Sequence, residues 1–170
     1  SLTVSHSAAL GSDFSNASGN YILATPTDGN DNNENSGIWF LDLATRMPMQ
    51  GLFLPTLPDG WKYEGWTVIS GMPVTTGTFT SATGVDFSST MEGPPFAGED
   101  FLMNAPSGLT FPTNIAGSVA VISIEPSPDN SSNPFLLKPL VGNIPADATD
   151  HVTYMMDQNL GSFPSGSAGR

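Results

Sequence analysis

The stretch "EGWTVISGMPVTTGTFT", residues 64–80, decides the fold class because it joins two alternating arms through a turn. Ser70-Gly71 separates the arms, and a glycine at such a two-residue connection supplies the positive φ that primed hairpin turns require. In the first arm, Trp66 and Val68 share one face. We expect both to face the core, and we interpret the hairpin as architecture rather than as a site.

The surrounding sequence repeats this rhythm of short strands and turns. The chain contains 18 Gly and 15 Pro in 170 residues, which interrupt nearly every stretch of ten and leave little room for helices. Residues 117–125 are apolar on both faces and should form a central strand. The other expected strands are residues 20–25, 37–43, 62–69 and 73–80, with edge strands at 2–4 and 134–141.

These strands predict one all-β domain over residues 1–170, an antiparallel β-sandwich or partly closed barrel of about seven to nine strands. Residues 146–160 are the longest stretch without Gly or Pro, and their apolar residues fall at helical spacing. We therefore allow one short helix there. The sequence contains no apolar run of the roughly 20 residues that span a bilayer.

The charge of the chain excludes several classes of partner. Its 16 acidic and four basic residues give a net charge of −12, which repels nucleic acids and anionic membrane surfaces. The chain has no Cys, which excludes disulfides and thiol chemistry. His6 and His151 lie in no metal motif, and no GxSxG or phosphate-binding loop occurs.

Three segments carry a family resemblance: "GIWFLDL" at 37–43, "LPTLPDGWKYEGWTVISGMPVTTGTF" at 54–79 and "AGSVAVISIEP" at 116–126. In order and spacing they resemble the extracytoplasmic C-terminal domain of the anti-sigma-K factor family, over roughly residues 37–142. The matching positions are Leu57, Pro58, Gly60, Tyr63, Trp66, Gly71, Pro73, Gly77, Phe79, Val121, Glu125 and Pro126.

The resemblance implies a non-catalytic, extracytoplasmic sensor or binding domain of a bacterial envelope protein, with a protein or envelope component as its partner. That family also carries a sigma-binding segment and a transmembrane helix, which are not in these 170 residues, so sigma-factor inhibition does not transfer to them. Because the chain starts at Ser1 without Met, we expect a trimmed, exported protein of the periplasm or cell surface. A lipoprotein-type anchor upstream of Ser1 is one expected attachment.

The alternative hypothesis is a carbohydrate-binding or Ca²⁺-dependent adhesion module of the cell envelope. Asp28, Asn30, Asn32 and Glu34 alternate in "DGNDNNEN" and offer the oxygen ligands that Ca²⁺ prefers. The run fails as an EF-hand loop, and a solvated, turn-rich loop is the simpler interpretation. We expect no other cofactor.

The aromatic residues offer a platform for stacking a sugar ring. Core packing is the simpler interpretation for Trp39 and Trp66, whereas Trp61 follows a turn and should be more exposed, with Tyr63 beside it. We therefore take Trp61 and Tyr63 as candidate surface residues.

The loop "GPPFAGEDF", residues 93–101, adds Phe96, Glu99 and Asp100 as candidate partner contacts, with a plain surface connection as the alternative. A hydrolase would need a pair of carboxylates, such as Glu64 with Glu99 or Asp100, to converge in one cleft. The spacing does not indicate such a pair, so we do not expect an enzyme.

Overall fold

The computed structural model describes residues 10–29, 31–82 and 93–163, and this part of the chain is all-β. Its helical content is limited to two short 3₁₀ turns, η2 (Glu34–Ser36) and η3 (Leu160–Ser162). The strands are β1 (Ser18–Leu23), β2 (Gly37–Trp39), β3 (Leu41–Asp42), β4 (Met49–Gln50), β5 (Leu52–Phe53), β6 (Trp61–Ile69), β7 (Met72–Phe79), β8 (Gly98–Asp100), β9 (Val119–Pro126), β10 (Leu140–Asn143) and β11 (Tyr154–Gln158).

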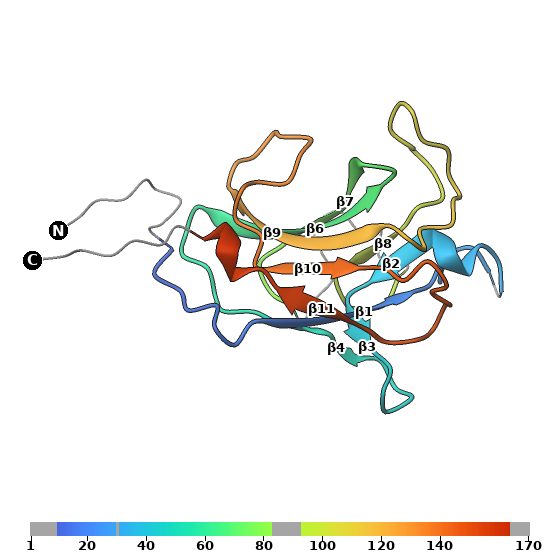
Figure 1. Cartoon of the computed structure of the whole chain (residues 1–170), viewed down its shortest axis with the longest axis horizontal. Coiled ribbons are helices and arrows are strands. Elements are labelled where there is room, and N and C mark those ends of the chain that lie inside the picture. The colour runs from blue at the N-terminus through green and yellow to red at the C-terminus, as the bar shows by residue number, and fades with distance from the viewer. Residues whose placement is uncertain (1–9, 30, 83–92, 164–170) are drawn as a thin grey trace, which may run out of the picture.

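Nine strands form one antiparallel sheet in the order β7-β6-β9-β10-β11-β1-β2-β8, with β5 paired to β1. The sheet curls until its two edge strands, β7 and β8, approach each other, so that the barrel is nearly closed (Figure 1). β3 and β4 form a separate two-stranded sheet. The prediction of an all-β, partly closed barrel is confirmed.

The hairpin that decided the fold class forms as β6 and β7. Ser70 and Gly71 make the turn with φ of 52° and 82°, as a type I′ connection requires. The predicted orientation of the first arm is wrong: Tyr63 and Ile69 contact the interior, and Trp66 lies on the outer face while remaining only 2% exposed. A side chain on Gly65 would collide with the ring of Phe40 inside the barrel.

Strand β9 is central, as its two apolar faces predicted, because it lies between β6 and β10. Ala120, Ile122 and Ile124 are buried in the interior. The expected edge strand at 134–141 is corrected: β10 begins only at Leu140, after Pro139, and is an interior strand between β9 and β11. Residues 2–4 lie outside the described part of the chain.

The predicted helix over residues 146–160 is wrong. The chain there makes a turn and then forms β11, which pairs with β1 and β10. The β-branched and aromatic residues in this stretch suit a strand, and pairing on both sides supplies hydrogen bonds that an isolated helix would have to make alone. Met156 alternates inward as a core residue, and Met155 is 80% exposed.

A second, smaller core lies on the outside of the barrel. Trp39 packs there with Ile22, Ala24 and Leu41. Gly93 lies so close above the indole that a Cβ at this position would be 2.1 Å from Trp39 Cη2. The segment that begins at residue 93 thus covers Trp39. The prediction that Trp39 and Trp66 are buried is confirmed, although Trp66 is buried on the outer face of the barrel.

Candidate functional site

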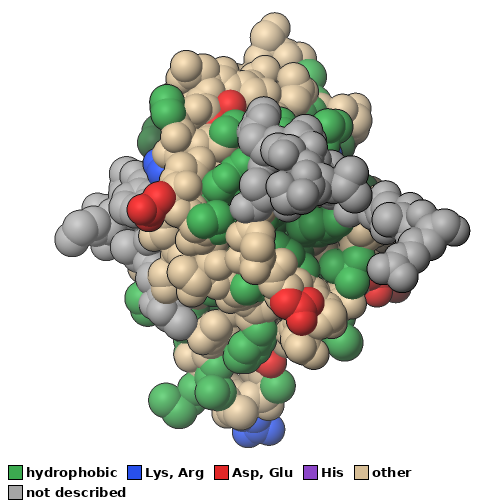
Figure 2. All heavy atoms as spheres, turned by 90° about the vertical axis from the view of Figure 1, so that its left-hand side faces the viewer, with side chains coloured by type: hydrophobic (Ala, Val, Ile, Leu, Met, Phe, Trp, Pro, Cys, Tyr) green, Lys and Arg blue, Asp and Glu red, His purple; other side chains and the backbone are tan. Residues whose placement is uncertain are grey.

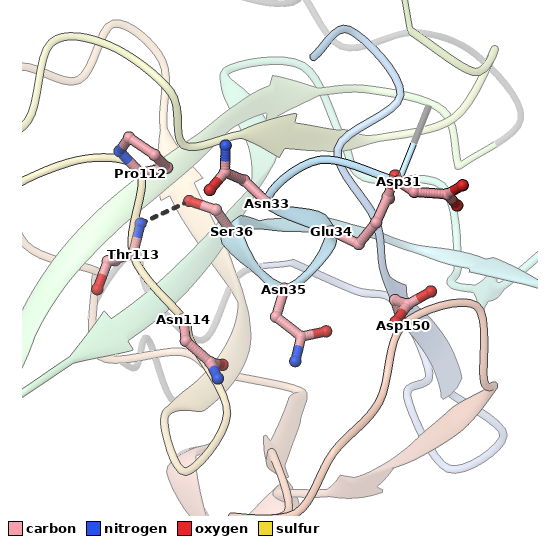
Figure 3. A pocket seen from close by; sticks show the side chains of 9 residues that line it. All are labelled: Asp31, Asn33, Glu34, Asn35, Ser36, Pro112, Thr113, Asn114 and Asp150. Atoms are coloured by element: carbon pink, nitrogen blue, oxygen red, sulfur yellow. Dashed lines mark hydrogen bonds between the residues drawn. The ribbon is translucent and has the colours of Figure 1, made fainter. Parts of the chain in front are cut away.

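A polar pocket of about 400 Å³ opens at the end of the barrel that lies on the right in Figure 1. Three segments that are distant in sequence supply its walls: residues 31–36, residues 112–114 and Asp150. The lining side chains belong to Asp31, Asn33, Glu34, Asn35, Ser36, Pro112, Thr113, Asn114 and Asp150 (Figure 3). We call this the pole pocket.

Hydrogen bonds from η2 fasten the walls of the pole pocket to one another. The Thr113 N–H donates to Ser36 Oγ at 2.8 Å, and that hydroxyl donates to the Phe101 carbonyl at 2.7 Å. The Ile115 N–H donates to the Asn35 carbonyl at 2.9 Å. Because the Ser36 hydroxyl and one backbone–backbone bond link these segments, the fold itself holds the pocket in shape.

The walls also contain residues with left-handed backbone. Asp31 and Asn33 have φ of 59° and 48°, and His151, next to Asp150, has φ of 57°. Asn, Asp and His adopt this conformation more readily than other non-glycine residues. The Asx-rich composition of residues 28–35 is thus explained by turn geometry.

The lining of the pole pocket is acidic, with three carboxylates from Asp31, Glu34 and Asp150 and no Lys or Arg. Glu34 Oε2 accepts a hydrogen bond from the Thr25 N–H at 3.0 Å, and Asp150 Oδ2 lies 2.8 Å from His151 Nδ1. In the described part of the chain, no three His, Asp or Glu side chains converge closely enough to hold a metal ion. The carboxylates are spread around the pocket and do not focus on one point.

Asn35 adds an unusual acceptor to this wall. Its Nδ2 donates to the Ala148 carbonyl at 3.3 Å, whereas its Oδ1 is shielded from solvent and accepts no hydrogen bond. The side chain lies between Asn114 and Asp150 (Figure 3). Asn35 Oδ1 is therefore a buried acceptor without a protein partner, which is costly in a folded chain.

The structure describes three of the four residues predicted as calcium ligands, and these three do not line one pocket. Asp28 Oδ2 accepts from Asn33 Nδ2 at 2.6 Å, and the Asn32 amide donates to the Asp28 carbonyl at 3.0 Å. Of the four, only Glu34 lines the pole pocket, and Asn30 lies outside the described residues. Calcium binding by this loop stays a prediction.

The expected aromatic surface at Trp61 and Tyr63 does not form. Tyr63 is 1% exposed and donates its hydroxyl proton to the Pro55 carbonyl at 2.5 Å, and burial raises its pKa well above its usual range. Trp61 is half-buried and lies against Phe135, with ring centroids 6.0 Å apart. The prediction of an exposed Tyr63 is wrong because alternation in β6 places it inside the barrel.

The candidate contact loop at 93–101 is mainly scaffold. Asp100 is 8% exposed, and its carboxylate accepts from the Trp39 indole N–H at 2.8 Å and from the Thr27 N–H at 2.9 Å. Phe96 packs partly buried on the outer core around Trp39. Of the predicted surface residues in this loop, Asp100 is therefore corrected to a structural role.

The carboxylates weighed for hydrolysis lie near the seam between β7 and β8. A hollow of about 350 Å³ there is lined by Glu99, Asp100 and Thr75, among others. Thr75 Oγ1 donates to Glu64 Oε1 at 2.5 Å, so Glu64 is tied to its neighbouring strand. Both Glu64 and Asp100 thus have a structural hydrogen-bonding role.

Sequence reasoning missed most of the pole pocket. Asn35, Thr113, Asn114 and Asp150 come from loops that the strand pattern leaves unpaired, and only the tertiary fold brings them together. A usable signal was present in "PTN" at 112–114 and "DATDH" at 147–151, since Pro, Asn and Asp mark turns where functional side chains gather.

Comparisons of the chain with protein-family models, curated proteins and solved structures return no match. The resemblance to the anti-sigma-K factor family therefore stays a prediction. In the described ranges, no helix is long and apolar enough to cross a bilayer.

Proposed function

We propose that the chain is a non-catalytic binding domain that works outside the cytoplasm, in the sensory role that the anti-sigma-K resemblance implies. The observation that carries the proposal is the pole pocket, whose polar walls come from three distant segments and are cross-linked by hydrogen bonds. A pre-formed, acceptor-rich pocket binds a ligand at low ordering cost.

The position of the pocket agrees with a sensory role. Residues 10–17 and η3 lie at the left-hand end of the barrel in Figure 1, where the rings of Phe14 and Phe163 lie with centroids 4.9 Å apart. The pole pocket opens at the opposite end. The described chain therefore starts and finishes at the end of the barrel opposite the pole pocket.

The chemistry of the walls favours a ligand rich in hydrogen-bond donors, and a small organic amine fits best. Three carboxylates supply acceptors, while the lining contains no basic side chain to repel a cation. The net charge of −12 also raises the local concentration of cations around the molecule. Because the carboxylates are spread out, a ligand with two separated ammonium groups uses them better than a single metal ion does.

Calorimetric titration with 1,4-diaminobutane tests this proposal. We expect binding that weakens with added salt, because the attraction is between charges near the surface. The double variant D31N/D150N should bind about tenfold or more weakly, and D59N, which removes an exposed carboxylate outside the pocket, should bind like the wild type.

A parallel titration with CaCl₂ separates the amine from the calcium alternative. Ca²⁺ binding that D31N/D150N abolishes, with no binding of the diamine, would contradict the amine assignment and return the Asx-rich loop to the adhesion hypothesis. Diamine binding that is equal in the wild type and the double variant would contradict the pole pocket as the site.

A further inference from the structure

A third hollow, of about 310 Å³, lies at the end of the barrel opposite the pole pocket. It is lined by Asp13, Asn16, Ala17, Gln50, Phe53, Leu54 and Pro55. Figure 2 looks onto this end of the molecule and shows hydrophobic side chains among polar atoms where the surface is not drawn in grey.

The aromatic side chain in this hollow is held outward by strand register. β5 pairs with β1 so that Leu52 stands opposite Gly19 and is fully buried, which leaves Phe53 on the other face. Phe53 is 55% exposed, although a phenyl ring in water loses the stabilisation that burial would give. The fold therefore presents a flat apolar ring at a concave place on the surface.

Polar groups flank that ring. The Asp13 carboxylate accepts from the Ser15 N–H at 2.8 Å, and this bond lowers the pKa of Asp13. Gln50 donates its Nε2 to the Leu52 carbonyl at 2.5 Å, which leaves the amide oxygen available. The Asn16 side chain is exposed and makes no hydrogen bond within the described ranges.

We propose that this hollow, with Phe53 as its floor and Asp13, Asn16 and Gln50 at its edge, binds a neutral sugar ring. The apolar C–H face of a pyranose packs on an aromatic ring, and its hydroxyls exchange hydrogen bonds with carboxylate and amide groups. The acidity of the chain selects against sugars that carry carboxylate or sulfate. This site is separate from the pole pocket and does not depend on it.

Saturation-transfer NMR with the whole chain tests the proposal. The probes are cellotetraose, chitotetraose, maltotetraose and mannotetraose, with trigalacturonate as the anionic comparison. At least one neutral probe should receive saturation at its ring C–H protons, and trigalacturonate should receive none. Absence of transfer to all four neutral probes at millimolar concentration would overturn the proposal.

Variants assign any binding to the hollow. F53A should weaken binding about tenfold or more, because the stacking face is lost, whereas F53W should bind at least as well as the wild type. M155A removes a side chain that is 80% exposed outside the hollow and should leave binding unchanged. Equal binding by F53A and the wild type would contradict the site.

The pole variant D31N/D150N keeps this test distinct from that of the proposed function. It should bind the sugar like the wild type, since none of its altered residues lines the Phe53 hollow. Loss of sugar binding in D31N/D150N but not in F53A would place the sugar in the pole pocket and overturn the assignment to Phe53.

Discussion

The seam between β7 and β8 and the pole pocket both contain carboxylates, but those at the seam are structural and those at the pole are exposed to solvent. At the seam, Asp100 is almost buried, and its carboxylate oxygens accept hydrogen bonds from Trp39 and Thr27. At the pole, Asp31 and Asp150 are exposed and face an open pocket. A buried carboxylate that the protein hydrogen-bonds is scaffold, whereas an exposed carboxylate that lines a pocket is a candidate for binding even where, as at Asp150, one oxygen contacts a neighbouring side chain.

Glu125 belongs with the seam carboxylates by this measure. It is 1% exposed, and its Oε1 accepts hydrogen bonds from the Ser123 hydroxyl and the Phe135 N–H. Ser123 in turn accepts from the Trp66 indole N–H at 2.8 Å. The outer face of β6 and β9 is therefore held by a polar chain, whereas the inner face is held by apolar packing.

The largest loss of stability is expected from a substitution at the seam between β7 and β8. D100A leaves the Trp39 indole N–H and the Thr27 N–H without their acceptor in a nearly buried place, which should cost about 3 kcal/mol in the free energy of unfolding. Urea unfolding of the two proteins measures the difference. A loss below about 1 kcal/mol would show that Asp100 is not structural and would break the comparison.

The next effect is a dependence on pH at Glu125. Burial raises the pKa of its carboxyl above the ordinary 4.5, although the hydrogen bonds from Ser123 and Phe135 and the charge of Lys138 oppose the shift. The folded state thus binds this proton more tightly than the unfolded chain. The stability that Glu125 contributes is fully present below its unfolded pKa and is lost as the pH rises through the raised value.

Comparing the wild type with the E125Q variant measures how the stability contributed by Glu125 depends on pH. We expect the free energy of unfolding of the wild type, relative to that of E125Q, to fall between pH 4.5 and pH 8, because the neutral amide does not ionise. Urea unfolding at several pH values measures it, with D59N as the exposed control. A difference that is flat with pH would mean that Glu125 titrates in the same way in both states.

The smallest effect on stability belongs to the pole. D31N/D150N should change the free energy of unfolding by no more than about 0.5 kcal/mol, since both side chains are exposed. Thermal unfolding of D31N/D150N and D100A, measured under the same conditions, compares the two losses of stability directly. A loss comparable to that of D100A would mean that the pole carboxylates hold the loops together and that the two regions do not differ in kind.

The sequence predicts the strands well because alternation and turn residues are local. The β6–β7 hairpin follows from Ser70-Gly71 and its flanking arms, and the central place of β9 follows from two apolar faces. Which face of β6 enters the barrel could not be predicted, because Tyr63 and Trp66 are both large and aromatic and both end up buried. The register in which β6 pairs with β9 decides whether the face with Tyr63 or the face with Trp66 enters the barrel.

The candidate site was less predictable for a physical reason. The run "DGNDNNEN" indicates a loop, and hydrogen bonds within that part of the chain join Asp28 to Asn33 and Glu34 to Thr25. Asn114 and Asp150 join that loop across long sequence separations through the folding of the barrel. Local residue types thus indicate where a site can form, whereas the set of residues that face one another depends on the closed sheet.

The central claim is that ligand binding belongs to the pole pocket, and amide shift mapping tests it most directly. ¹H–¹⁵N spectra of the wild type should change on addition of 1,4-diaminobutane at residues 31–36, 113–116 and 148–151, with the seam residues 98–99 unaffected. Changes centred on the seam, or spread evenly over the acidic surface, would contradict the account.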